Sequence, residues 1–196
     1  MMLVSELGGK YELGFIVLLA HFLLKREDAL LCATVLCFSI LINQQLKLTF
    51  AEPRPFFVRP GPPGTPCDDL EYGNPSGHAI AFTSLMLVFK DGVCSTLADL
   101  YLGRLHIIIT IMIWLFILIV IFSRFYFDAH SIDQLATGFM LGLFLYYQAT
   151  WIKTDVKNLR IQRMKTFPLK SFTEPLFLVF TVSFGVCVYN YFSTPE

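Results

Sequence analysis

The chain has 196 residues, of which 55% are hydrophobic and 15% are charged, and its formal net charge is zero. This apolar fraction is high for a soluble domain, and the apolar residues are gathered in long blocks rather than spread along the chain. Blocks that are apolar all round are what lipid-facing helices need, so the composition argues against a soluble helical bundle and for an integral membrane protein.

Six apolar runs are predicted to form helices. A run of about 18 residues rises about 27 Å as an α-helix, which is close to the thickness of the hydrocarbon layer. The first and third runs are shorter and need flanking residues or burial against neighbours. The expected fold is therefore an all-α, polytopic membrane bundle of about six helices, in one domain covering residues 1–196. The runs are residues 13–24, 29–46, 79–89, 105–122, 135–151 and 176–191.

The basic residues are divided unevenly between the two faces that alternating helices define. Ten of the fifteen lie in the loops after the first, third and fifth runs, and the positive-inside rule places those loops in the cytosol. Both termini and the loop 53–75 then face the lumen, periplasm or exterior. The basic stretch 153–170 is interpreted as a membrane-proximal loop rather than a nucleic-acid patch. The ten are Lys25, Arg26, Lys90, Arg104, Lys153, Lys157, Arg160, Arg163, Lys165 and Lys170.

Chemically active residues gather at the ends of the runs on the non-cytosolic face. They are Lys47, Arg54, Ser76, Gly77, His78, Arg124 and His130. Charged groups at membrane depth are costly and are usually paired or functional. Guanidinium and ammonium groups match phosphoryl oxygens, glycine permits close backbone approach, and a helix N-terminus favours an anion. One histidine can attack phosphorus while the other protonates the leaving oxygen. The cluster therefore predicts phosphoryl transfer.

Other candidate residues are given ordinary structural interpretations. His21 lies inside the first run and His106 near the cytosolic end of the fourth, so both are assigned structural or interfacial roles. Asp68, Asp69 and Glu71 have no histidines spaced around them, and they are interpreted as a solvated acidic loop. No metal ion and no cofactor are expected.

Three motifs within this cluster resemble those of the type 2 phosphatidic acid phosphatase (PAP2) superfamily, which shares its site with vanadium haloperoxidases. The family pattern is Lys-x6-Arg-Pro, then Pro-Ser-Gly-His, then Ser-Arg-x5-His-x3-Asp. Here the first motif runs from Lys47 to Pro55 and the second occupies residues 75–78. The third begins at Ser123 and reaches His130. Three motifs in the right order and spacing carry far more weight than one motif alone.

The resemblance covers roughly residues 29–151 and implies a role for each matching position. His130 resembles the nucleophile that forms a phosphohistidine, and His78 the general acid that protonates the leaving group. The positions that match phosphate-binding groups are Lys47, Arg54, Ser76, Gly77 and Arg124.

One position departs from the family pattern. The family usually has Asp four residues after the nucleophile to hold its imidazole, whereas this chain has Gln134 there and Asp133 one residue earlier. On a helix both positions lie near the histidine's face, so either side chain could accept the ring N–H. Some members, including glucose-6-phosphatases and dolichyl-diphosphate phosphatases, also have Gln at this place. We expect Gln134, more than Asp133, to orient His130.

The sequence thus predicts a metal-independent membrane phosphatase for a lipid phosphate or lipid (polyprenyl) diphosphate. A lipid substrate is preferred because a site at helix ends opens to the headgroup layer. The protein is expected in the endoplasmic reticulum or plasma membrane, with its site on the non-cytosolic face that the positive-inside rule indicates. Two alternatives stay open: a glucose-6-phosphatase-like sugar phosphatase, and an inactive lipid-binding or scaffold protein on the same fold. The expected partners are the membrane and a lipid phosphate substrate, not nucleic acid, and homo-oligomerisation is left open.

Overall fold

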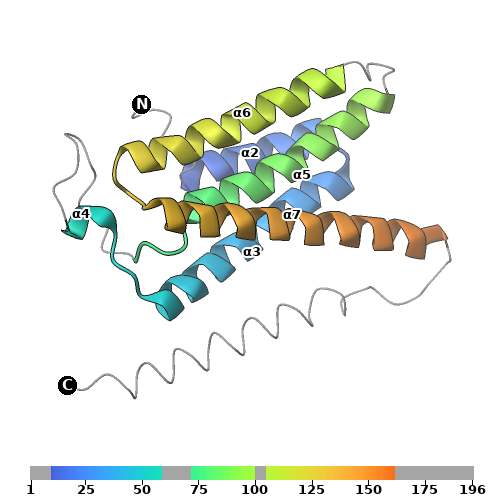
Figure 1. The fold of residues 1–196 in the computed structure, drawn as a ribbon. Helices are drawn as coiled ribbons and strands as arrows, with labels where there is room; N and C mark the ends of the chain where they lie inside the picture. Colours follow the sequence, from blue (N-terminus) through green and yellow to red (C-terminus); the bar gives the residue numbers. More distant parts are fainter. Residues whose placement is uncertain (1–9, 59–71, 100–104, 162–196) are drawn as a thin grey trace.

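The computed structural model describes residues 10–58, 72–99 and 105–161, and every regular element in these ranges is a helix (Figure 1). This confirms the prediction of an all-α bundle. Helices α3, α5, α6 and α7 are long and apolar enough to cross a membrane, whereas α2 is shorter. The sixth predicted run, 176–191, lies outside the described residues. The helices are α2 (Lys10–Leu23), α3 (Arg26–Phe50), α4 (Pro55–Val58), α5 (Gly77–Asp99), α6 (Leu105–Tyr126) and α7 (Ile132–Ile161).

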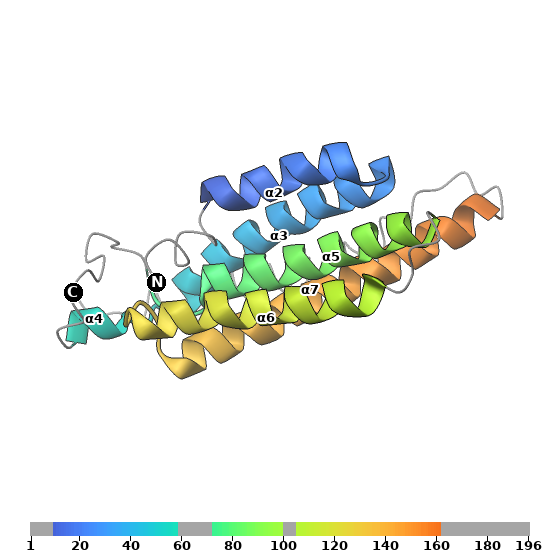
Figure 2. The same ribbon diagram turned by 90° about the horizontal axis from the view of Figure 1, so that it is seen from above.

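The four long helices lie side by side and alternate in direction (Figures 1 and 2). Helices α3 and α6 therefore end where α5 and α7 begin, and we call this end of the bundle the site end. Figure 1 shows it at the left, with the short helix α4 beyond it. The opposite end holds the C-termini of α2, α5 and α7. The sequence motifs thus meet at one end because they flank helices of alternating direction.

Helix α5 is the centre of the bundle, since it packs against α3, α6 and α7. Its side chains Phe82 and Leu85 are fully buried, and Phe82 meets Phe116 of α6 edge to face, with ring centroids 5.2 Å apart. Gly138 and Gly142 of α7 face α5, where added Cβ atoms would lie 2.7 Å from the Ser76 carbonyl and 2.8 Å from the Thr83 side chain. This small-xxx-small spacing lets the two backbones approach closely. The start of α7 is thereby held against the start of α5.

The end of α3 sets the position of the first motif. Ala51 adopts a left-handed conformation with φ 49°, and its N–H donates to the Lys47 carbonyl at 2.9 Å. A left-handed residue of this kind closes a helix by capping one of its last carbonyls. Pro55 then starts α4, where a missing N–H costs no helical hydrogen bond. Lys47 consequently lies in the last turn of α3, and Arg54 lies in the connection just before α4.

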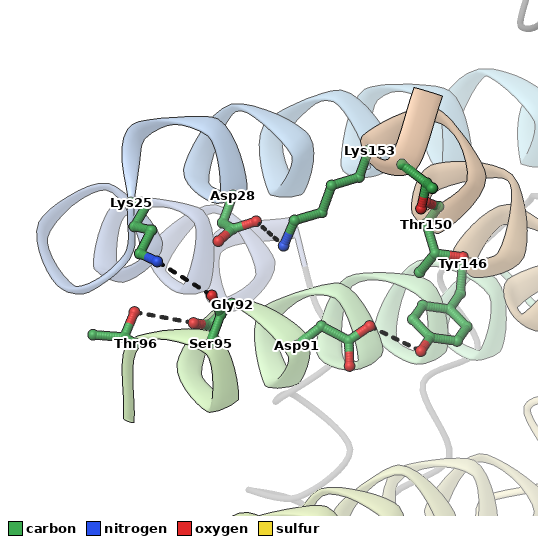
Figure 3. A network of polar contacts seen from close by, with 10 residues as sticks. Lys25, Asp28, Asp91, Gly92, Ser95, Thr96, Tyr146, Thr150 and Lys153 are labelled. Carbon is green, nitrogen blue, oxygen red and sulfur yellow. Dashed lines mark hydrogen bonds and ion pairs between the residues drawn. The ribbon is translucent and has the colours of Figure 1, made fainter. Parts of the chain in front are cut away.

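The opposite end is fastened by polar contacts between helices (Figure 3). The buried Asp28 carboxylate of α3 lies 2.5 Å from the Lys153 ammonium of α7. On α5, Asp91 pairs with its neighbour Lys90 at 2.9 Å and accepts a hydrogen bond of 2.8 Å from the Tyr146 hydroxyl of α7. These contacts join α3 and α5 to α7 at the end of the bundle far from the motifs.

Candidate active site

Three basic side chains are buried together at the site end. Lys47, Arg54 and Arg124 are only 5%, 3% and 6% exposed. Each also has polar or electrostatic contacts within the chain, and the Arg54 guanidinium lies 5.8 Å from the ring centroid of Phe56. Burying several like charges is unfavourable unless something compensates for it, and these groups match the oxygens of a phosphate anion.

His130 lies in the short connection between α6 and α7 and is 2% exposed. Its Nδ1 lies 2.9 Å from the main-chain carbonyl oxygen of Gly73. Because a carbonyl oxygen can only accept a hydrogen bond, Nδ1 carries the ring proton and Nε2 keeps its lone pair. The hydrogen bond therefore leaves Nε2 as the nucleophilic atom of the ring.

The surroundings of His130 keep its imidazole neutral. Burial lowers its pKa most, and the nearby charges of Arg54, Arg124 and Lys47 lower it further, to about 3. The hydrogen bond to Gly73 opposes this shift without cancelling it. A neutral imidazole has a free lone pair at physiological pH, which a nucleophile requires.

The second motif forms the start of α5. Ser76 is fully buried, its Oγ accepts a 3.5 Å hydrogen bond from the Ala79 N–H, and its N–H donates to the Gln134 carbonyl at 3.1 Å. Ser76 thus caps α5 and joins it to α7. Gly77 follows without room for a side chain, since a Cβ there would lie 2.7 Å from Nδ2 of the buried Asn43.

His78 lies in the first turn of α5 and is partly buried. It lies within electrostatic range of Arg124, His130, Arg54 and Lys47. The structure therefore brings both histidines and the three basic residues into one cluster at the N-termini of α5 and α7. A phosphate group held there would face a nucleophile, a proton donor and several cations at once.

The hydrogen-bond partner of the His130 ring differs from the side chains considered in the sequence analysis. Asp133 is exposed, and Gln134 is buried, but the Nδ1 hydrogen bond of His130 goes to the Gly73 carbonyl. Helix α7 begins only at Ile132, so His130 lies outside it and the i+4 spacing of a helix does not apply. The Gln134 side chain instead accepts from the Ser131 N–H and donates to the Pro53 carbonyl.

Sequence reasoning missed the Gly73 carbonyl, since a main-chain acceptor leaves no signature in side-chain spacing. It also missed the capping arrangement at the start of α7, although residues 131–134, Ser-Ile-Asp-Gln, match the Ser-x-x-Gln capping-box pattern. In that pattern the Gln side chain reaches back to the N-cap N–H, and here Gln134 Oε1 accepts from the Ser131 N–H at 3.3 Å. This signal was available in the sequence.

In residues 10–58, 72–99 and 105–161 there is no group of three or more His, Cys, Asp or Glu side chains placed to hold a metal ion. The acidic residues Asp68, Asp69 and Glu71 lie outside these ranges.

Comparison with known proteins agrees with the motifs. A sequence model of the PAP2 superfamily matches residues 28–158. The chain belongs to the PAP2 superfamily. A dihydrosphingosine 1-phosphate phosphatase of Saccharomyces cerevisiae is 26% identical in an alignment 154 positions long that covers 74% of this chain and 36% of that protein. The chain thus spans about a third of the length of this curated relative.

The fold also matches a solved member of the family. The crystal structure of a transmembrane PAP2-type phosphatidylglycerolphosphate phosphatase from Bacillus subtilis aligns with a TM-score of 0.67. The alignment covers 80% of this chain and 76% of that chain, at 22% sequence identity. The helical arrangement described above is therefore the PAP2 membrane fold.

Proposed function

We propose that the chain is a membrane phosphatase that hydrolyses a lipid phosphate through a phosphohistidine intermediate. The observation that carries this proposal is the convergence of buried Lys47, Arg54 and Arg124 around a neutral His130 at one end of a membrane-spanning bundle. Positive groups fixed in a water-poor site stabilise the charge that develops on a transferring phosphoryl group.

A lipid substrate fits the position of the site. The ends of membrane-spanning helices lie near the headgroup layer, so a phosphorylated headgroup reaches them without leaving the membrane. The names of both relatives also describe phosphatases of lipid phosphates, dihydrosphingosine 1-phosphate in one and phosphatidylglycerolphosphate in the other. A lipid phosphate monoester is therefore the first substrate to test, ahead of a lipid diphosphate.

In the first step, Nε2 of His130 attacks phosphorus and the ester P–O bond breaks. The electron pair of that bond passes to the leaving oxygen, which takes a proton from His78 and departs as the lipid alcohol. The bound phosphate anion beside His78 favours its protonated form beforehand. Nδ1 of His130 keeps its proton throughout, because the Gly73 carbonyl accepts it.

In the second step, water attacks phosphorus of the phosphohistidine and gives a proton to the now neutral His78. The P–N bond breaks and its electron pair returns to Nε2. The products are inorganic phosphate and the starting enzyme, so the sum is hydrolysis of the ester with no other reactant. The basic residues hold the three equatorial oxygens in both steps.

A substrate panel tests the function. Detergent-purified protein would be given a sphingoid-base phosphate, phosphatidate, a polyprenyl diphosphate and glucose 6-phosphate in the presence of chelator, and released phosphate would be measured. We expect the highest kcat/KM on a lipid monophosphate, with no loss in chelator. Preference for glucose 6-phosphate would favour a sugar phosphatase. Binding of lipid phosphates with no turnover would favour a scaffold.

The site end is proposed to face away from the cytosol, because most basic residues flank the other end. Exposed Tyr72 lies at the site end and exposed Thr154 near the opposite end. The native thiol of the loop 53–75 is first removed by the substitution Cys67→Ser. Where the protein lies in the plasma membrane, an impermeant thiol reagent applied to intact cells should then label Tyr72→Cys and not Thr154→Cys. In sealed microsomes with an outward cytosolic face the pattern should reverse. Labelling with the opposite sidedness would invert the topology.

A further inference from the structure

The side chain of Gln134 lies at the junction of the site segments, although the chemistry above gives it no step. It is 3% exposed. Its Oε1 accepts from the Ser131 N–H at 3.3 Å, next to His130, and its Nε2 donates to the Pro53 carbonyl at 3.1 Å, next to Arg54. One amide group thus joins the segment of the third motif to that of the first.

The second motif is tied to the same residue through the main chain. The Gln134 carbonyl accepts a hydrogen bond from the Ser76 N–H at 3.1 Å. All three motif segments therefore meet at Gln134. A change in the position of Gln134 would therefore shift all three motif segments.

The segment that orients His130 also rests on Gln134. A Cβ added at Gly73 would lie 2.6 Å from Oε1, 2.7 Å from Nε2 and 2.9 Å from Cδ of Gln134. The amide end of Gln134 therefore fills the space where a side chain at Gly73 would lie, beside the residue whose carbonyl accepts the Nδ1–H of His130. On the other side, the Gly73 N–H donates to the Glu52 carbonyl at 2.7 Å. Gly73 is held from both sides.

We propose that Gln134 is a positioning residue that fixes the Gly73 carbonyl, and that this main-chain carbonyl sets the tautomer and direction of the His130 ring. A loop carbonyl can do this only if its segment is immobilised, which is what the packed Gln134 amide provides. Nδ1 of the nucleophile is thus held by a neutral main-chain acceptor, and Gln134 acts without touching the ring. The kinetic readout rests on the proposed phosphatase function, but the tautomer itself can be observed without it.

A glutamate substitution separates this proposal from direct support of the ring. Gln134→Glu keeps the acceptor oxygen but replaces the Nε2 donor with an oxygen that faces the Pro53 carbonyl. We expect its kcat to fall about 10- to 100-fold, the loss known for residues that orient a ligand at metal sites, and to the same level as that of Gln134→Ala. If the Gln134 side chain held the imidazole directly, Gln134→Glu would match or exceed the wild type, which would overturn the proposal.

A double substitution tests the contact with Gly73. Gly73→Ala should reduce kcat because its methyl group collides with the Gln134 amide. In a Gln134→Ala background the methyl group has room, so the additional loss should be clearly smaller than in the wild type. Losses that simply multiply would show that the two residues do not act together. The matched controls are Gln44→Ala, an exposed glutamine on α3, and Gly14→Ala, where nothing lies within 4 Å.

Nitrogen-15 NMR observes the His130 ring directly. The chain has four histidines, so ¹⁵N-histidine-labelled protein in detergent gives few ring signals, and His130→Ala assigns the one of interest. We expect His130 to be protonated at Nδ1 in the wild type and in Gln44→Ala, and to become a tautomer mixture in Gln134→Ala, whose melting temperature checks that it is folded. An unchanged tautomer in folded Gln134→Ala would overturn the proposal whether or not the protein is a phosphatase.

Discussion

The two ends of the bundle arrange their charged side chains differently. At the opposite end, Asp28 of α3 pairs with Lys153 of α7, and Asp91 of α5 accepts a hydrogen bond from the Tyr146 hydroxyl of α7 (Figure 3). Asp91 also pairs with its neighbour Lys90 on the same helix. Such contacts satisfy the charges within the chain and fasten the helices together. They explain how the bundle holds its shape rather than what it does.

At the site end, by contrast, like charges gather around one histidine. Lys47, Arg54 and Arg124 all act to lower the pKa of His130, together with its burial. Positive groups that oppose protonation of a neighbouring histidine are unfavourable by themselves. The same groups become favourable when an anion binds among them. The comparison leads us to interpret the opposite end as a structural fastening and the site end as the place where the proposed phosphate group would bind.

Removal of the nucleophile should have the largest effect. His130→Ala should abolish turnover on every substrate, since loss of a catalytic nucleophile can cost about a million-fold in kcat, as it does in a serine protease. Released phosphate measures the loss, and the melting temperature in detergent checks the fold. Appreciable activity of His130→Ala on an activated aryl phosphate would mean that another group attacks phosphorus.

Removal of the proton donor should have an effect that depends on the leaving group. General acid catalysis is typically worth about 100- to 10,000-fold. His78→Ala should lose up to this factor on a lipid monophosphate, whose alkoxide needs a proton. It should lose much less on an aryl phosphate or a lipid diphosphate, which have less basic leaving groups. An equal loss on all three substrates would show that His78 binds phosphate instead of donating a proton.

A substitution at the opposite end should affect stability and spare the chemistry. Asp28→Asn cannot pair with Lys153, and because the Lys153 side chain is 37% exposed it can turn to water. We expect a loss of about 1–2 kcal/mol in the free energy of unfolding, between the values for surface and buried pairs, and unchanged kcat/KM per folded molecule. Adding Lys153→Met should recover part of the stability. A kcat/KM that falls in folded Asp28→Asn would break the division between the two ends.

The last expected effect is on the pH dependence of stability. The pKa of His130 is about 3 in the folded protein and about 6.5 in an unfolded chain, so the unfolded chain binds more protons between these values. The contribution of His130 to stability is therefore present above about pH 6.5 and is lost as the pH falls toward 3. Between pH 7 and pH 5, the melting temperature of the wild type should drop more than that of His130→Gln. Equal drops would show that the folded site accepts the proton readily.

Much of this arrangement was predictable from local sequence patterns. Long apolar runs identified the four membrane-length helices, because hydrophobicity and length decide which segments cross a bilayer. Alternation of helix direction then placed Lys47, Arg54, His78, Arg124 and His130 at one end. Gly138 and Gly142 have a spacing that suits close helix contact, but only the structure shows that their partner is α5.

The features that could not be predicted depend on how distant segments of the chain lie against each other in the folded protein. The Gly73 carbonyl lies 57 residues from His130 in the chain, and no side-chain pattern marks a main-chain acceptor. The expectation for Gln134 assumed that His130 belongs to the helix, whereas α7 begins after it. The pair of Asp28 with Lys153 likewise follows from how α3 and α7 lie against each other, which neither segment shows alone.

The most direct test of the central claim is to trap the covalent intermediate. Purified protein would be mixed briefly with a ³²P-labelled lipid phosphate, quenched in alkali and examined for protein-bound label. A phosphohistidine contains a P–N bond that survives alkali and breaks in acid. We predict alkali-stable, acid-labile label in the wild type and none in His130→Ala. Label of the same kind in His130→Ala, or turnover by the wild type with no trapped label under any quench time, would contradict a phosphohistidine at His130.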